Sequence, residues 1–168
     1  TDVKITYIAN AGVLIGNESV NILIDGLHTK PVEGFSPVPV EVCDMIMQKK
    51  GVMKQIDFML FTHCHKDHCD IDAVSNYQNK NTKIFIPGKA IKKIRDENRL
   101  TLSMEGNYQD EHVEIVVIKS EHAGDKQFSA CEHVSFLLKF QDMTIFVMGD
   151  SEIGDGKLLG SLKGEEID

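Results

Sequence analysis

The sequence predicts an α/β protein in which helices pack against at least one face of a β-sheet. Two observations indicate this class. Apolar runs of strand length dominate residues 1–25, and helical and strand-like segments then alternate as far as residue 118. The 168 residues are enough to bury a sizeable core, and they suit a single domain over residues 1–168.

The first third is expected to form an antiparallel meander. Its three short apolar runs are Lys4–Ile8, Val13–Ile15 and Val20–Ile24. Glycine-containing turns separate them, and Asp25-Gly26 ends the third. Residues 28–39 carry three prolines and one glycine and predict an irregular loop.

The middle of the chain alternates helix and strand. Apolar spacing predicts a helix over 40–50, Asp70 or Asp72 is expected to cap a helix running to about Tyr77, and residues 88–98 predict a helix with a solvated basic face. The expected strands are Ile56–Phe61, Lys83–Ile86 and Val113–Ile118.

A hairpin is expected near the end of the sequence. Its arms are Val134–Phe140 and Thr144–Met148, turned by Gln141-Asp142, and the second arm leads into Gly149-Asp150. The last stretch, 151–168, is acidic and Gly-rich and predicts no clear element.

The segment that directly follows the buried strand Ile56–Phe61 carries the clearest chemistry. It holds three histidines and an aspartate in six positions: His63, His65, Asp67 and His68. A strand that ends in a tight turn can aim several such side chains at one point, and imidazole with carboxylate suits divalent transition metals. Asp150 also follows a strand, and open α/β sheets place function at the carboxyl ends of their strands.

Composition excludes some classes of partner. The chain has 18 basic and 26 acidic residues, a net charge of −8, which argues against binding to nucleic acid. No apolar run is long enough to cross a bilayer, and no secretory signal opens the chain. The four cysteines form no CxxC pair, so a reducing, cytoplasmic location is expected.

The spacing His63-x-His65-x-Asp67-His68 resembles the HxHxDH signature of the metallo-β-lactamase superfamily. Residues 6–15 look like the first hairpin of that family, Ile22–Asp25 like its next strand, and Phe146–Asp150 like its later strand ending in Gly-Asp. The resemblance runs from about residue 4 to residue 150. It implies an αββα sandwich whose second half is incomplete here.

The resemblance also implies a binuclear metal site. His63 and His65 would bind one metal with a later histidine, for which His122 is the choice and His133 the alternative. Asp67 and His68 would bind the second metal, and Asp150 would bridge both. Asp67 and Asp150 are therefore the candidate catalytic residues, Asp67 by orienting a hydroxide. Asp25 would either accept a hydrogen bond from a ligand histidine or cap a turn.

The implied activity is that of a metal-dependent hydrolase using a metal-bridging hydroxide. Two divalent ions roughly 3.5–4 Å apart can hold hydroxide at neutral pH. A small-molecule substrate, an ester, lactone, thioester or phosphodiester, is implied by the resemblance and not by the composition. Zinc is expected first and manganese second. The di-iron redox members carry Glu where this chain has His65. A di-iron redox protein and a metal-binding module without turnover are the alternatives.

The sequence departs from the family pattern after Asp150. The family places one more histidine ligand there, and residues 151–168 contain none. A truncation at the C-terminus is expected; loss of the end in one lineage, or a ligand from a second chain of a homo-oligomer, are the alternatives. Of the other histidines, His112 is expected at the surface, and so is His28, for which a place in the substrate cleft is the alternative.

Overall fold

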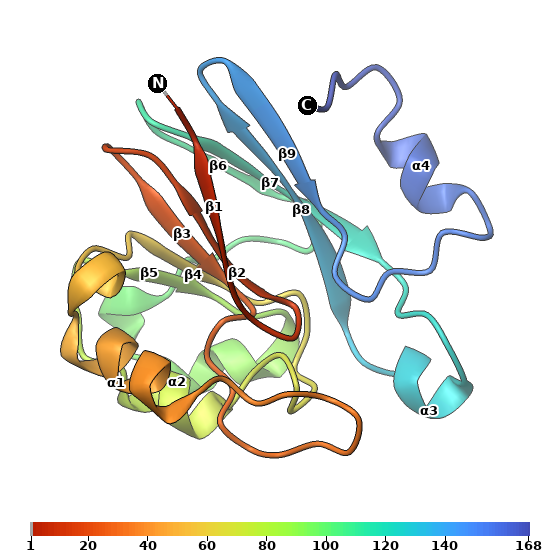
Figure 1. The fold of residues 1–168 in the computed structure, drawn as a ribbon. Coiled ribbons are helices and arrows are strands. Elements are labelled where there is room, and N and C mark those ends of the chain that lie inside the picture. The colour runs from red at the N-terminus through yellow and green to blue at the C-terminus, as the bar shows by residue number, and fades with distance from the viewer. Residues whose placement is uncertain (1) are drawn as a thin grey trace. The chain divides into compact units, whose positions relative to one another are not determined.

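The computed structural model describes residues 2–168. Contacts divide them into two compact units, Asp2–Leu100 and Thr101–Asp168. The first unit holds a five-stranded sheet and the second a four-stranded sheet, with short helices in both (Figure 1). The α/β class is confirmed, and a single domain over residues 1–168 stays a prediction.

The first sheet begins with the expected antiparallel meander. Its strands, in spatial order, are β1 (Lys4–Ala9), β2 (Gly12–Gly16), β3 (Asn21–Ile24), β4 (Phe58–Leu60) and β5 (Lys83–Phe85). The first three pair antiparallel, whereas β4 and β5 add in parallel. Parallel neighbours need long crossover connections, and here those connections contain the helices.

Helices α1 (Val40–Gln48) and α2 (Ile71–Asn76) pack along one face of this sheet (Figure 1). Ile46 of α1 and Val74 of α2 join one apolar cluster with sheet residues such as Met59. The proline-bearing loop before α1 is irregular, as expected, apart from isolated bridges. Apolar burial of this kind is what stabilises such short helices.

The cap of α2 gives a first testable prediction. The Asp70 carboxylate accepts hydrogen bonds from the main-chain N–H groups of Asp72 and Ala73 and from Thr29 Oγ1. Replacing Asp70 by alanine is expected to lower the free energy of unfolding by about 1–2 kcal/mol, measured by urea denaturation. Asp72→Ala, at the exposed alternative position, is the control and should cost about 0.5 kcal/mol or less.

The same prediction carries a pH dependence. Burial raises the pKa of Asp70, but the hydrogen bonds from Thr29 and the helix N–H groups, with Lys30 nearby, outweigh it and hold the pKa below its ordinary value. A lowered pKa stabilises the fold above the unfolded-state pKa of about 3.9. The difference between wild type and Asp70→Ala should therefore shrink as the pH falls below about 4. An equal difference at pH 7 and pH 3 would contradict the capping role.

One expected helix is wrong. Residues 88–98 form two short 3₁₀ helices, η2 (Gly88–Lys93) and η3 (Asp96–Asn98), separated by Ile94 in an extended conformation. Ile94 is buried, and the buried Asn98 amide donates to two main-chain carbonyls at 2.7 and 2.8 Å. Burying both residues requires the chain to turn, so the helical pattern is interrupted. A third 3₁₀ turn, η1 (Gly51–Met53), follows α1.

The second unit is built on an antiparallel meander. Its strands are β6 (Asn107–Gln109), β7 (Glu114–Ser120), β8 (His133–Phe140) and β9 (Met143–Val147). The expected β8–β9 hairpin is confirmed. Strand β6 was not predicted because its sequence, Asn-Tyr-Gln, is short and polar.

Two short helices complete this unit. They are α3 (Lys126–Ser129) and α4 (Lys157–Ser161). The expectation of no element after residue 150 is wrong because the buried Leu158 side chain anchors α4 against β7.

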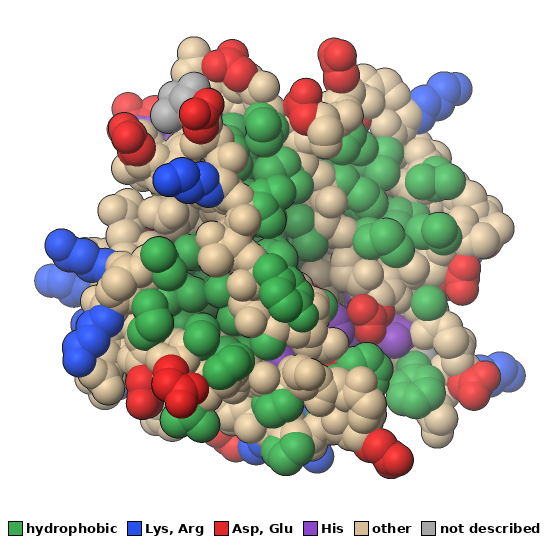
Figure 2. Space-filling view, viewed as in Figure 1, with side chains coloured by type: hydrophobic (Ala, Val, Ile, Leu, Met, Phe, Trp, Pro, Cys, Tyr) green, Lys and Arg blue, Asp and Glu red, His purple; other side chains and the backbone are tan. Residues whose placement is uncertain are grey.

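The surface agrees with the acidic composition. Figure 2 shows acidic side chains spread over one face, with apolar and uncharged side chains between them. Among the described residues, no helix is both long enough and apolar enough to cross a membrane. A cytoplasmic location stays a prediction.

Candidate metal centre

The loop after β4 is folded into one tight turn. The N–H groups of His68 and Cys69 both donate to the His65 carbonyl oxygen, at 3.0 and 2.9 Å. The Asn10 side-chain amide donates to the Asp67 carbonyl oxygen at 2.9 Å and ties the turn to the β1–β2 connection. Four side chains of the expected ligand types are thereby held on a single short segment.

Asp25 accepts three hydrogen bonds from this loop. It lies at the end of β3 with φ 47° and is 1% exposed. Its Oδ1 accepts from the Thr62 N–H at 2.9 Å, and its Oδ2 accepts from Thr62 Oγ1 at 2.7 Å and from His68 Nδ1 at 2.8 Å. Asp25 thus accepts a hydrogen bond from a candidate ligand histidine, which is one of the two roles expected for it. Its bonds to Thr62 could not be predicted from the sequence.

These bonds assign the tautomer of two histidines. A carboxylate only accepts, so His68 carries its proton on Nδ1 and keeps the lone pair on Nε2. Thr62 Oγ1 gives its one proton to Asp25, so at 2.9 Å it accepts from His63 Nδ1. In the neutral imidazole, Nε2 of His63 therefore also carries a lone pair, which is the form that binds metals.

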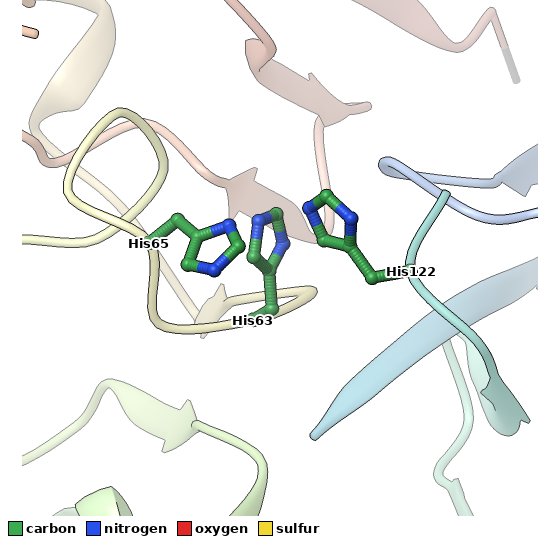
Figure 3. A group of neighbouring side chains, drawn as sticks. All are labelled: His63, His65 and His122. Atoms are coloured by element: carbon green, nitrogen blue, oxygen red, sulfur yellow. The ribbon is translucent and has the colours of Figure 1, made fainter. Parts of the chain in front are cut away.

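The side chains of the loop gather at one place. The His63 ring lies 4.6 Å from that of His65 and 4.1 Å from that of His68, centroid to centroid. His63 and His65 stand edge to face on the loop after β4 (Figure 3). Asp67 Oδ2 lies 3.6 Å from His68 Nε2. This arrangement agrees with the predicted pairing of Asp67 and His68.

In the second unit, His122 and Asp150 lie on two loops that are bonded together. His122 follows β7 (Figure 3), and Asp150 follows β9 after Gly149, whose φ of 59° favours glycine. The Ala123 N–H donates to the Asp150 carbonyl oxygen at 2.8 Å, and His122 forms an isolated bridge with Ser151.

The two predicted ligands of this unit face each other. His122 Nε2 lies 3.5 Å from Asp150 Oδ2. His122 Nδ1 donates to the Ala123 carbonyl oxygen at 2.6 Å, and a carbonyl cannot donate, so the neutral ring again keeps its lone pair on Nε2. An imidazole lone pair and a carboxylate oxygen at this separation suit a shared cation.

His133, the alternative ligand, is 1% exposed. Its Nε2 accepts a hydrogen bond from the Asp150 N–H at 3.1 Å, and its Nδ1 lies 2.7 Å from Ser120 Oγ. The lone pair of His133 is therefore engaged by the main chain, so His122 remains the candidate ligand. His133 and Ser120 pair in register on neighbouring strands β8 and β7, and the sequence alone does not show this pairing.

The expectation for His28 is wrong, and that for His112 is confirmed. His28 is 0% exposed, because its ring is enclosed where the proline-bearing loop folds back and the Val38 N–H donates to its carbonyl oxygen. Burial lowers the pKa of His28, against smaller opposing effects that include the Ala9 carbonyl, and the ring is neutral at pH 7. The His112 side chain is 42% exposed.

One of the two cysteines beside the motif is a poor metal ligand. Cys64 is exposed and Cys69 is buried. A hydrogen bond with Cys64, together with burial, raises the pKa of the Cys69 thiol. Cys69 is therefore a thiol at neutral pH, whereas metals bind the thiolate.

A family profile described as "Beta-lactamase superfamily domain" matches residues 4–156. No curated protein matches in sequence. The chain is similar to the solved structure of a possible metal-dependent hydrolase from Veillonella parvula, with 16% identity, a TM-score of 0.70, and coverage of 96% of this chain and 68% of that one.

Two further solved structures are similar. An isothiocyanate hydrolase from Delia radicum gut bacteria is 20% identical, with a TM-score of 0.66 and coverage of 95% of this chain and 67% of that one. The diiron β-hydroxylase CmlA from Streptomyces venezuelae is 15% identical, with a TM-score of 0.67 and coverage of 99% and 33%. The chain thus spans 33% to 68% of the lengths of these three proteins. At these identities the structures show the fold alone.

The HxHxDH loop, the two sheets and the family profile all agree with the resemblance seen in the sequence. The chain belongs to the metallo-β-lactamase superfamily, whose fold its two sheets and short helices share.

Proposed function

We propose that this chain is a metal-dependent hydrolase whose binuclear centre draws ligands from both units. The proposed ligands are His63, His65 and His122 for one metal, Asp67 and His68 for the other, and Asp150 for both. The first unit offers three imidazoles and one carboxylate, and the second offers one of each. Shared between two metals, this set has the nitrogen and oxygen donors that zinc prefers.

One observation carries the proposal. Three of the candidate histidines hold their Nδ1 proton in a hydrogen bond to an acceptor on the chain: His68 to Asp25, His63 to Thr62 and His122 to the Ala123 carbonyl. Each Nε2 lone pair is thereby fixed in advance of binding. Acceptors of this kind accompany nearly all metal-ligating histidines, and a solvated polar loop would not need them.

The carboxylates have separate tasks. Asp67, beside His68 Nε2, would hold and move a proton during attack on the substrate, the role of a general base and acid. Asp150 is proposed as the bridging ligand. Divalent metals bound here would polarise a substrate oxygen and make water a nucleophile at neutral pH.

Substrate and metal are proposed only by class. Small esters, lactones, thioesters and phosphodiesters are the first candidates, and the likeness to an isothiocyanate hydrolase adds isothiocyanates to the panel. Zinc is proposed first and manganese second because His65 occupies the position where di-iron members carry Glu. The likeness to a diiron β-hydroxylase keeps iron as an outcome of metal analysis.

Replacing His63 by alanine tests the proposal. Wild type is expected to bind about two zinc or manganese ions per chain, and His63→Ala should lose at least one ion and at least about 100-fold in activity, because a binuclear site acts as a unit. Mass spectrometry of metal content and the hydrolase panel are the measurements.

His112→Ala is the matched control, because that histidine is exposed and should be dispensable. Equal metal retention in both variants would refute the ligand assignment. Metal without turnover of any substrate class would leave a binding module. Bound iron with oxygen consumption would indicate the redox alternative.

A further inference from the structure

A buried polar network lies directly behind Asp150. His133 Nε2 lies 3.1 Å from the Asp150 main-chain nitrogen, and His133 Nδ1 lies 2.7 Å from Ser120 Oγ. Ser135 and Ser151 extend the network, with Ser135 Oγ 3.1 Å from Ser120 Oγ and 2.7 Å from Ser151 Oγ. Polar groups buried in a strand layer are costly unless every one is satisfied.

The direction of the bonds can be assigned. A main-chain N–H only donates, so Nε2 of His133 must be an acceptor. The neutral ring then carries its proton on Nδ1 and donates to Ser120 Oγ. This tautomer is the same as that of the candidate ligand His122, but in His133 the Nε2 lone pair is directed at the main chain of Asp150.

The network ends on the turn that carries Asp150. Ser135 Oγ and Ser151 Oγ both lie within hydrogen-bond distance of the Met148 carbonyl oxygen, Ser135 at 2.9 Å. On its other side, the Asp150 carbonyl oxygen accepts from the Ala123 N–H at 2.8 Å. Both hydrogen-bonding groups of the Asp150 main chain are therefore held by the chain.

We propose that His133 is a positioning residue for Asp150: its Nε2 accepts the Asp150 N–H and so fixes the direction of the bridging carboxylate. The inference rests on the proposed function, because it matters only if Asp150 binds metal. If this buried position at the start of β8 served packing alone, an apolar residue would suffice. A buried imidazole with a defined tautomer supplies what an apolar residue cannot, an acceptor at one end and a donor at the other.

Two conservative variants separate the two ends of the ring. His133→Gln places an amide oxygen near the Nε2 position and can still accept the Asp150 N–H. His133→Asn places its shorter amide near the Nδ1 position, where it can bond to Ser120 but not to Asp150. If His133 has a purely structural role, the two variants should bind metal alike. If His133 positions Asp150, only His133→Gln should keep the metal binding of wild type.

The readout is the cobalt-loaded protein. Titration of the metal-free protein with Co²⁺ gives the affinity of each site, and the visible absorption bands report its coordination. His133→Asn is expected to weaken the weaker Co²⁺ site by about 10–100-fold and to change its bands, and His133→Gln should stay within about threefold of wild type. Asn98→Ala, which removes a buried amide that bonds to the Asn79 and Thr82 carbonyl oxygens rather than to the turn carrying Asp150, should lower thermal stability and leave the bands unchanged.

The outcomes are separable. Wild type that binds no Co²⁺ would overturn the proposed function itself. Wild type that binds two ions, with both variants unchanged or both equally impaired, would overturn only the role of His133. Long-range proton–nitrogen NMR of the wild-type imidazole gives a check that needs no variant: a proton on Nδ1 is expected, and a proton on Nε2 would overturn the inference.

Discussion

Replacing Asp25 by asparagine is expected to weaken metal binding by about 10–100-fold and to lower the free energy of unfolding by about 2–3 kcal/mol. The carboxylate accepts three hydrogen bonds, two from Thr62 and one from His68. Asparagine has one acceptor oxygen, and its NH₂ group would face a buried donor. The His68 ring, and through Thr62 that of His63, would lose the bond that keeps the Nε2 lone pair available. Zinc competition against a chromophoric chelator and urea denaturation measure the two effects.

Asp57→Asn is the matched control. Asp57 also accepts a main-chain N–H bond, from Asn21 at 2.8 Å, but its other side-chain bonds go to Gln55 rather than to any candidate ligand. This variant should lose some stability and keep wild-type zinc affinity. If Asp25→Asn unfolds more easily but binds zinc as tightly as wild type, Asp25 supports the fold alone, and the tautomer argument for His63 and His68 is wrong.

Removing bound metal is expected to lower the melting temperature by about 8–16 °C. A ligand present at about 1,000 times its dissociation constant stabilises the native state by about 4 kcal/mol, and 1 kcal/mol shifts the midpoint by about 2–4 °C for a chain of this size. The buried carboxylates Asp25 and Asp67 and the net charge of −8 add to the benefit of bound cations. Scanning calorimetry with and without a strong chelator measures the shift.

The His63→Ala variant provides the control for this shift. Its midpoint should respond much less to the chelator, because a principal ligand is gone. The shift should also grow with free zinc concentration, as mass action requires. An identical shift in wild type and His63→Ala would mean that the chelator acts elsewhere on the protein.

Much of the fold could be predicted because its strands and helices follow simple patterns. The three runs that became β1 to β3, the helix over α1 and the β8–β9 hairpin each combine an apolar pattern with turn residues. The helix predicted over residues 88–98 does not form, because the conformation of this segment depends on burying Ile94 and Asn98. The local sequence pattern does not show that the Asn98 amide will donate to main-chain carbonyl groups of Asn79 and Thr82.

The residue types of the candidate site could be read from the sequence, but its hydrogen bonds could not. The HxHxDH spacing and the Gly149-Asp150 strand end are local features, so the sequence shows where these side chains follow their strands, and their role as metal ligands stays a prediction. The acceptors behind the histidines are contributed by Asp25, 43 positions before His68, and by the Ala123 main chain, which no composition reveals. The bond between His133 and Ser120 was not predictable, because the residue that starts a strand gives no sign of its partner on the neighbouring strand.

The proposed binuclear centre requires that the ligands of both units serve one pair of metals. Anomalous diffraction at the zinc edge, from crystals of the zinc-loaded protein, shows where the metals bind. Two peaks roughly 3.5–4 Å apart are expected, one about 2.0–2.1 Å from Nε2 of His63 and His122, with Asp150 oxygens beside both. Peaks bound by residues of only one unit, or no peak at the HxHxDH loop, would rule out the proposed binuclear centre.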